Sequence, residues 1–521
     1  MLLLHDIPAE QAAALSGALS GEFSDALSGA PGEQCSCFAA EPPVRACAGC
    51  FACWVKSPGR CAIPDRGQAF AGLLAEHGIL AVASRLVFGG FSPSVKAVLD
   101  RSIGYMLPFF RVVGNAGGGR SGCNAGGNGG RGEMHHIKRN ARPLSLRCFF
   151  YGDSIAPEDR DIAERLAAAN ALNLGAELSH VGFYPSAAAL AGAVLLGDGL
   201  PGGRPASRAP GARARCAWPS SAKSLGAELS SKESPSEESR GAETPVGGKF
   251  ADGAASRKLK IALLNGSPKG HASASQSLLA ALRARLPQDA EIVAGNIPIH
   301  IPGRATGNIP SSTPGNIPSN IPSSTSGNIP SNISSSTPGN IPSHISSHIS
   351  DARIPDGEGP NTAILAAMRG CDALVLAFPL YVDGLPSHVV RFLDGWRQEI
   401  GAACGGAKVY ALANNGFYEA RQNSLALAML GRFCERAGLG WGMGAGIGAG
   451  GMIGAAPIGR GPLAKLGEAL DGMARKIAGL QSADSVYAEP NFPRFLYILA
   501  AHVGWRKQGR ANGLSPRQLR G

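Results

Sequence analysis

The fold is decided by the stretch KIALLNGSPKGHASASQSLLAALRAR, residues 260–285. Residues 260–265 are a short apolar run typical of a buried strand, and the residues from Ser277 onward have the apolar spacing of a helix. The polar turn between them, residues 266–276, is rich in serine and glycine. A helix that begins after such a turn presents unpaired amide groups and the positive end of its dipole, and both favour an anion. The stretch therefore predicts a parallel α/β fold with a phosphate-binding loop; a plain helix-capping loop is the alternative.

Two further apolar runs end in loops of a similar kind. Residues 373–378 are followed by PLYVDGLPS (379–387), and residues 408–413 are followed by NNGFYE (414–419). In a doubly wound parallel sheet, ligands bind beyond the carboxyl ends of the strands, where the strand order reverses. Because apolar runs alternate with amphipathic helices along the ordered sequence, we expect mostly parallel sheets covered by helices on both faces.

The three loops NGSPKGxxSxS, FPLYVDGLPS and NNGFYE, in that order, resemble those of the NAD(P)H-dependent FMN reductase and flavodoxin-like flavoprotein family. The resemblance covers roughly residues 258–294 and 361–480. It implies an FMN-dependent oxidoreductase that takes hydride or electrons from NAD(P)H and passes them to a small acceptor. The chemistry belongs to the cofactor, so no acid–base triad is expected.

The same resemblance implies a role for each loop. The first loop would hold the FMN phosphate through Ser267, Lys269, Ser273, Ser275 and Gln276. The second would lie against the edge of the flavin ring through Pro379, Leu380, Tyr381, Val382 and Gly384. The third would close over the ring through Asn414, Gly416, Phe417 and Tyr418.

The first half of the chain repeats part of this pattern. Residues 86–100 align with residues 380–394 at a constant offset of 294. The identical pairs are Leu86 and Leu380, Gly90 and Gly384, Val95 and Val389, Leu99 and Leu393, and Asp100 and Asp394. The N-terminal strand, however, is followed directly by a helix and has no glycine–serine loop. We therefore expect two tandem flavodoxin-like domains that form an internal pseudo-dimer, in which the first half walls the flavin site but does not bind FMN in the family manner.

The first half carries a compact cysteine motif instead, formed by Cys47, Cys50, Cys53 and Cys61. Thiolates at this spacing can converge on one metal centre, and the motif resembles that of iron–sulfur flavoproteins, which hold a [4Fe–4S] cluster near the flavin. Four cysteines would serve zinc equally well as ligands, and thiols without metal would have a structural or redox role. A cluster would favour an electron-transfer protein that serves a protein partner. A non-catalytic flavodoxin-like binding protein is a third function that the sequence leaves open.

Composition sets the domain boundaries. Glycine and proline, 72 and 37 of 521 residues, gather in a few segments without apolar periodicity. These are an insert at 114–131, a linker at 196–257 and an insert at 295–360 that contains a repeated GNIP motif, all of which we expect to be disordered. The expected domains are then 1–195 and 258–485, followed by a basic helical extension at 486–521.

Charge and hydropathy restrict the partners. The net charge is +11, and six of the basic residues lie at 494–521, where there is no acidic residue. We expect the last helix to present a solvated basic face, and we expect neither nucleic acid nor membrane as partner. The chain shows no signal peptide, and the stretch 437–459 has ten glycines in 23 residues, which predicts a loop and not a membrane helix. Nine of the 12 cysteines precede residue 217, which suits a reducing cytoplasm. His135 and His136 are expected on an exposed basic hairpin.

Overall fold

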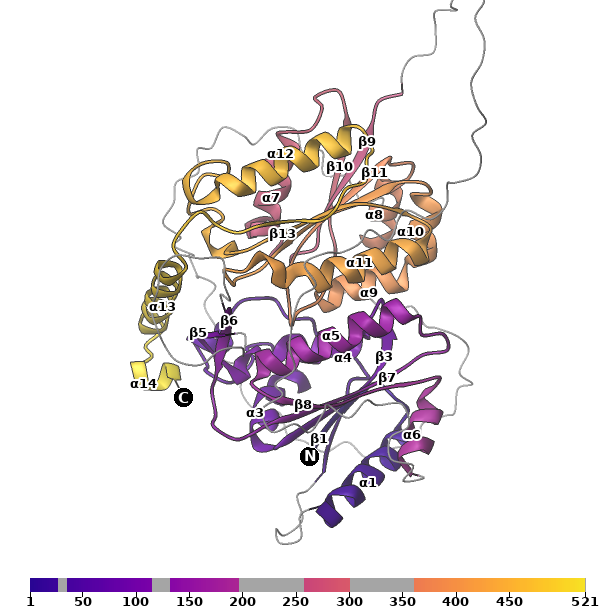
Figure 1. Cartoon of the computed structure of the whole chain (residues 1–521), viewed down its shortest axis with the longest axis vertical. Helices are drawn as coiled ribbons and strands as arrows, with labels where there is room; N and C mark the ends of the chain where they lie inside the picture. The colour runs from indigo at the N-terminus through magenta and orange to yellow at the C-terminus, as the bar shows by residue number, and fades with distance from the viewer. Residues whose placement is uncertain (27–34, 115–131, 196–256, 300–359, 521) are drawn as a thin grey trace, which may run out of the picture.

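A computed structural model describes residues 1–26, 35–114, 132–195, 257–299 and 360–520. The segments 115–131, 196–256 and 300–359, on which the expected inserts and linker fall, lie outside the described residues. The described part of the chain contains two mostly parallel sheets, each flanked by helices on both faces (Figure 1). The predicted α/β fold with two parallel sheets is confirmed, and the arrangement is compatible with a tandem doubly wound fold.

The first sheet has the strand order β2-β1-β3-β7-β8, and all neighbours in it are parallel. Its strands are β1 (Leu2–His5), β2 (Ser36–Ala39), β3 (Ile79–Val87), β7 (Ser145–Tyr151) and β8 (Glu177–Tyr184), with β4 (Gly90–Phe91) antiparallel to the end of β3. Its helices are α1 (Ala9–Ala26), α3 (Phe70–Glu76), α4 (Pro93–Asp100), α5 (Pro157–Leu174) and α6 (Ala187–Leu195). An antiparallel hairpin of β5 (Met106–Val113) and β6 (Glu133–Lys138) stands apart from this sheet.

The second sheet has the order β10-β9-β11-β12-β13-β14 and is parallel throughout. Its strands are β9 (Lys260–Asn265), β10 (Glu291–Asn296), β11 (Ala373–Pro379), β12 (Lys408–Asn414), β13 (Gly440–Ile447) and β14 (Val486–Ala488). Its helices are α7 (Ala274–Arg283), α8 (Pro360–Met368), α9 (Ser387–Gly395), α10 (Arg397–Ala403), α11 (Ser424–Ala437) and α12 (Ala464–Ala478). Strand β10 includes the first two residues of the segment that the sequence assigned to the insert at 295–360.

Helices outside the two sheets and short 3-10 turns complete the described part of the chain. They are α2 (Ala52–Val55), α13 (Arg494–Ala511) and α14 (Pro516–Arg520), with 3-10 turns η1 (Arg66–Ala69), η2 (Arg101–Tyr105), η3 (Gly270–Ala272), η4 (Ala420–Asn423), η5 (Gly450–Met452) and η6 (Gly461–Leu463). No helix among the described residues is both long enough and apolar enough to cross a membrane.

The two halves share a structural detail that supports their alignment. In the first half, Val87 pairs antiparallel with Gly90 across a two-residue turn. The positions 294 residues later, Tyr381 and Gly384, form the same antiparallel bridge. Both central residues of each turn have positive φ, at Phe88 and Gly89 in the first half and at 382 and 383 in the second. Aligned positions therefore form the same tight hairpin.

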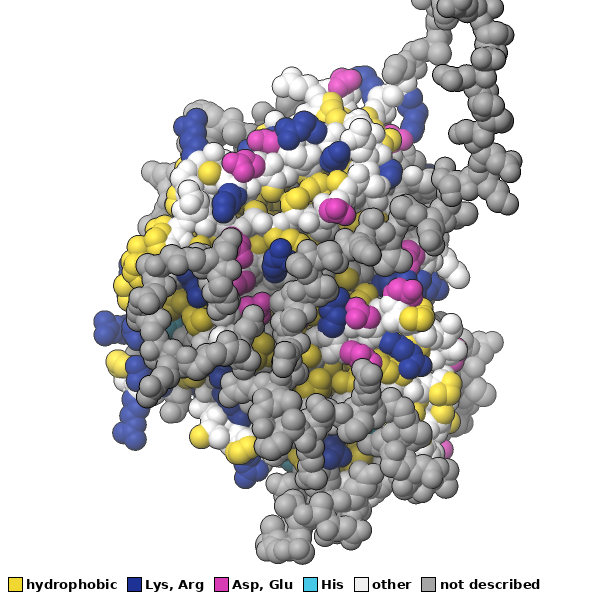
Figure 2. Space-filling model, viewed as in Figure 1, with side chains coloured by type: hydrophobic (Ala, Val, Ile, Leu, Met, Phe, Trp, Pro, Cys, Tyr) yellow, Lys and Arg dark blue, Asp and Glu magenta, His cyan; other side chains and the backbone are white. Residues whose placement is uncertain are grey.

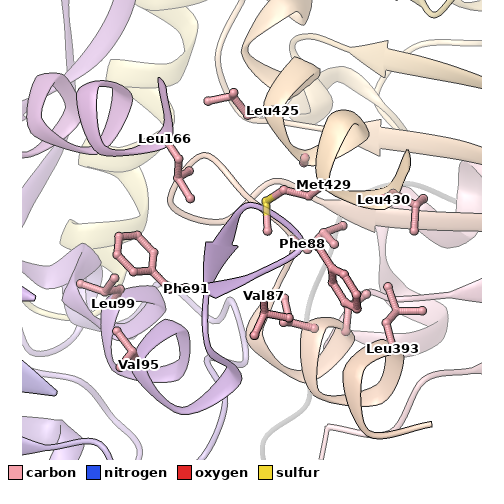
Figure 3. Close-up of a cluster of buried hydrophobic side chains, with 14 of the residues drawn as sticks. Val87, Phe88, Phe91, Val95, Leu99, Leu166, Leu393, Leu425, Met429 and Leu430 are labelled. Carbon is pink, nitrogen blue, oxygen red and sulfur yellow. The ribbon is translucent and has the colours of Figure 1, made fainter. Parts of the chain in front are cut away.

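One hydrophobic core joins the two halves. Helix α4 packs on α9, and α5 packs on α11. In Figure 1 these four helices lie between the two sheets. Phe88 meets Phe433 edge to face, with ring centroids 5.5 Å apart, and Met429 lies among side chains from both halves (Figure 3). A core that continues across the boundary makes the halves one packing unit rather than two loosely tethered domains.

The stretch 437–459 corrects the prediction of a glycine-rich loop, because it contains strand β13. Its alternate glycines face bulky neighbours. A Cβ atom at Gly442 would lie 2.6 Å from the Tyr410 ring, and one at Gly444 would lie 2.9 Å from Leu427. Glycine is present here because side chains from adjoining elements lie against the strand backbone, which is a recognised exception to its low strand propensity.

The C-terminal extension also differs from expectation. Helix α13 is helical and basic as predicted, but its inner side packs on β5 and α2. Its outer side exposes Phe495, Leu499 and Val503 by 69%, 55% and 54%. Figure 2 shows hydrophobic and basic side chains next to one another at the edge where α13 and α14 lie. The helix is thus not simply a solvated basic face.

Candidate functional site

A cavity of about 730 Å³ lies at the carboxyl ends of β9, β11 and β12. This edge includes the point between β9 and β11 where the strand order reverses, which is where doubly wound sheets bind ligands. The volume of the cavity falls in the range of small-molecule and cofactor pockets. The cavity brings together most of the predicted loop residues, which are Ser267, Lys269, Ser273, Ser275, Pro379, Leu380, Tyr381, Val382, Asn414, Gly416 and Phe417.

Three predicted residues do not line the cavity and support it from behind. The Gln276 side chain accepts a hydrogen bond from Asn265 at 3.2 Å. Gly384 closes the hairpin through two backbone bonds with Tyr381. The Tyr418 hydroxyl donates to the carbonyl of Phe492 at 2.8 Å and so ties the third loop to the C-terminal segment. Sequence spacing cannot tell such supporting residues from contacting ones, because both lie in the same loop.

The first loop has the donors that a phosphate needs. Ser273 is the N-cap of α7: its hydroxyl oxygen accepts the N–H of Gln276 at 3.1 Å, so this serine performs the capping role that the sequence left as an alternative. Ser275 Oγ accepts from the Asn414 amide at 2.9 Å, which leaves its O–H to donate. Lys269 is the basic side chain of this loop, and burial lowers its pKa. The Ser273 hydroxyl itself donates to the Gly270 carbonyl at 2.7 Å. Amides at the helix start, the Ser267 and Ser275 hydroxyls and the Lys269 ammonium group remain, and together they form an anion site of known type.

The second loop is strained. Val382 and Asp383 have φ of 44° and 56°. Aspartate tolerates this region, but a β-branched residue such as Val382 almost never occupies it. Such a conformation costs about 1–3 kcal/mol and persists only where surrounding contacts hold it. Asp383 is 6% exposed, and burial raises the pKa of its carboxyl group. The loop tip therefore has a fixed shape at the wall of the cavity.

The third loop is joined to the first two. The Asn414 side chain donates to Ser275 Oγ and to the carbonyl of Phe378 at 3.0 Å. Asn415 Oδ1 accepts the N–H of Phe417 at 3.1 Å, which turns the chain so that the Phe417 ring lines the cavity. Tyr497 of α13 donates to the Gly416 carbonyl at 2.7 Å. These bonds fix the loops relative to one another before any ligand binds.

A further part of the lining comes from the first half and α13, and we call it the aromatic wall; its members are Phe51, Trp54, Phe110, His136 and Trp505. Phe51 stacks on Trp54 at 5.0 Å, and Trp505 meets both rings edge on. His136 lies 4.6 Å from Phe110, and burial lowers the pKa of this histidine to about 3, so it is neutral at physiological pH. The five members therefore present uncharged, planar ring surfaces to the cavity.

This wall contains residues that the sequence argument placed wrongly or missed. His135 and His136 do lie on a hairpin, but His135 is 3% exposed and His136 lines the cavity, so the exposed setting was a wrong expectation. Trp505 and its neighbours on α13 were not predicted to line a site, because the segment 494–521 was interpreted only from its basic charge. The apolar residues between 495 and 505 were the available signal.

The four motif cysteines Cys47, Cys50, Cys53 and Cys61 also line the cavity. All four are free thiols. Burial raises the pKa of Cys47 to about 12. No group of three or more His, Cys, Asp or Glu side chains in the described residues is arranged to hold a metal ion. The four thiols are part of the cavity lining.

The cysteine segment lies directly on the second loop. At Gly49, which has φ of +62°, an added Cβ atom would be 2.1 Å from the Tyr381 hydroxyl. The Lys269 ammonium lies 4.9 Å from the Phe51 ring. The segment from the first half and the loops from the second half therefore form one continuous surface.

The corresponding edge of the first sheet has a different character. After β1, the Asp6 carboxylate accepts the N–H of Arg85 at 3.2 Å and the hydroxyl of Tyr151 at 3.0 Å. Burial raises the pKa of Asp6. A carboxyl group at the place of the phosphate loop offers no anion site, which agrees with the absence of a glycine–serine loop in the sequence.

Comparison with known proteins assigns the chain to no family. No protein-family model matches it, and no curated protein matches it. Residues and geometry therefore carry the functional argument.

Proposed function

We propose that this protein is an FMN-dependent NAD(P)H oxidoreductase whose flavodoxin-like second half binds the flavin. The observation that carries the proposal is the cavity, which collects the three predicted loops at the strand-order reversal of the second sheet. The second sheet supports the proposal through its strand order, β10-β9-β11-β12-β13. Sheets with this 2-1-3-4-5 order bind FMN at the point where the order reverses, as in flavodoxin.

The lining residues fit FMN at both ends of the molecule. Ser267, Ser275, Lys269 and the first amides of α7 would hold the phosphate. The 381–384 hairpin and Phe417 would contact the ring, with the aromatic wall next to Phe417. When bound, FMN would supply the hydride and electron chemistry, while the protein binds, orients and shields it from water. Because His136 is neutral, the aromatic wall carries no charge that would repel a nicotinamide or a small planar acceptor.

We further propose that the two halves form an internal pseudo-dimer. The contact of α4 with α9 joins helices that correspond under the offset of 294, and the contact of α5 with α11 joins the helices that follow the fourth parallel strand of each sheet in chain order. Contacts between equivalent elements are what a two-fold interface between identical subunits produces. The first half then provides the aromatic wall and the thiols, and the second provides the phosphate and ring loops.

The phosphate assignment can be tested by titrating FMN into the purified full-length protein and following flavin fluorescence. Ser275→Ala removes a hydroxyl donor to a charged group and is expected to weaken FMN binding about tenfold, or about 1.4 kcal/mol. The matched control is Ser277→Ala, two residues further along the same helix and exposed to solvent. Equal affinity for both variants, or no FMN binding by the wild type, would contradict the proposal.

A further inference from the structure

The tip of the 381–384 hairpin is held by side chains from the other half of the molecule. Lys96 Nζ donates to the carbonyl of Tyr381 at 2.7 Å, and Asn170 Nδ2 donates to the carbonyl of Val382 at 3.3 Å. Asn173 Nδ2 lies 2.8 and 2.7 Å from the two carboxylate oxygens of Asp383. We call Lys96, Asn170 and Asn173 the hairpin clamp. Three consecutive residues of the second half are thus fixed by the first half.

The clamp side chains are themselves fixed. Lys96 is 1% exposed and pairs with Asp100. The other carboxylate oxygen of Asp100 accepts the N–H of Ser387 at 2.9 Å, which joins the pair to the start of α9. Asn173 Oδ1 lies 2.7 Å from Nδ1 of His135, so its carbonyl side is occupied and its NH₂ group is directed to Asp383. The clamp is therefore a set of donors with defined directions.

The hairpin needs such support because of its sequence. The aligned turn in the first half places Gly89 at its second position, where positive φ is allowed without penalty. The second half has Val382 and Asp383 at the two central positions, both at positive φ. The hairpin's own two hydrogen bonds join only Tyr381 and Gly384. Contacts from outside the hairpin must hold its tip, and the clamp supplies them.

We propose that Lys96, Asn170 and Asn173 are positioning residues that hold the 381–384 hairpin in its cavity-facing conformation, so that the first half determines the ligand affinity of the second. The affinity part of this inference rests on the proposed FMN function, whereas the part about hairpin conformation does not. Lys96 does not line the cavity, whereas Asn170 and Asn173 do. Exchange at the hairpin of the apoprotein therefore separates their positioning role from direct contact with a ligand.

The first test measures the hairpin itself. Hydrogen–deuterium exchange of the full-length apoprotein is compared between wild type and the Asn170→Ala/Asn173→Ala variant. The clamp predicts about tenfold faster exchange in the peptide covering 380–384, with unchanged exchange in β9 and β12. Glu164→Ala, on the exposed side of the same helix α5, is the control and should change neither. Asn173→Asp is a second variant that keeps the shape but places like charge beside Asp383, and it should also accelerate exchange. Unchanged exchange at 380–384 in both variants overturns the inference.

The second test separates positioning from general loss of packing. The Asn170→Ala/Asn173→Ala variant is expected to bind FMN about tenfold more weakly than wild type. Adding Val382→Gly removes the residue for which positive φ is most costly, so part of the lost affinity should return. If the glycine weakens binding further, the hairpin is not held against strain and the inference is wrong. If the wild type does not bind FMN, the proposed function is wrong. The inference about the hairpin clamp is still tested, because the exchange experiment uses the apoprotein.

Discussion

At the scale of single residues, the phosphate loop shows how a few side chains serve the fold and the site together. Ser273 caps α7, Asn265 ties the loop ends, and Ser275 connects to Asn414 of the third loop. The remaining donors are the Ser267 and Ser275 hydroxyls, the Lys269 ammonium and the first amides of α7, and they belong to residues that line the cavity. The loop can be stable without ligand and still bind an anion.

The thiols give a second prediction at this scale. Cys50 is exposed, whereas burial raises the pKa of Cys47 to about 12, so almost none of Cys47 is thiolate at pH 8. Iodoacetamide is therefore expected to modify Cys50 well before Cys47, as followed by mass spectrometry of the peptide that contains both. FMN should slow the reaction at Cys50, which lines the cavity, but not at the exposed Cys37, which does not. Equal rates at Cys47 and Cys50, or protection of Cys37, would contradict the geometry.

Sequence reasoning reached these residues because loops after parallel strands must meet at one sheet edge. The sequence predicted that the three loops meet, and residues of all three line the cavity. The four motif cysteines line the same cavity. It could not show that Gln276, Gly384 and Tyr418 lie outside the cavity lining, since this depends on hydrogen-bond partners such as Asn265 and Phe492. Nor could it find Lys96, Asn170 and Asn173, whose partners are more than 200 residues away.

At the scale of elements, β13 is the clearest case in which tertiary packing overrides local preference. Its glycines weaken the strand in isolation, yet Tyr410, Leu427 and Tyr487 lie where side chains would otherwise be. Composition alone therefore pointed to a loop. The boundary at β10 failed for a related reason: residues 295–296 look like the start of the GNIP repeat but pair with β9. For α13, the basic charge led to the prediction of a solvated face, and the side of the helix that packs on β5 and α2 was not predicted.

A substitution in β13 tests this explanation. Gly444→Val adds a side chain where a Cβ atom would lie 2.7 Å from Ser485 Oγ and 2.9 Å from Leu427, so it should lower the free energy of unfolding by about 1–3 kcal/mol. Gly431→Ala in helix α11, where nothing lies within 4 Å of the added atom, should raise it by about 0.5–1 kcal/mol. Urea unfolding followed by circular dichroism measures both. A Gly444→Val protein as stable as wild type would show that β13 does not need its glycines.

At the scale of the whole molecule, the two halves pack against one another through a shared core. The contacts of α4 with α9 and of α5 with α11 bury a common core, and ion pairs cross the same boundary. Arg432 pairs with Asp159 at 2.9 Å, and Arg85 pairs with Asp394 at 2.5 Å. The alignment at an offset of 294 predicted two similar halves, and the two parallel sheets are compatible with that prediction. The sequence could not show that equivalent helices face one another, because that depends on side-chain packing between segments far apart in the chain.

A core shared by both halves has a measurable consequence. Phe433 is fully buried and packs on Phe88 of the other half, so Phe433→Ala should cost about 3–5 kcal/mol of unfolding free energy. Fluorescence and circular dichroism should report one coincident unfolding transition for the wild type, because neither half can expose its core without the other. Two separate transitions in the wild type, with only the later one shifted by Phe433→Ala, would show that the halves are independent domains.

The most direct test of the central claim is the visible absorption spectrum of the full-length protein reconstituted with FMN, recorded without oxygen before and after addition of NADPH or NADH. The proposed function predicts bound-flavin absorption that remains with the protein through gel filtration and bleaches when a nicotinamide donor is added. A protein that retains no flavin, or one whose flavin absorption persists with both donors, would contradict it.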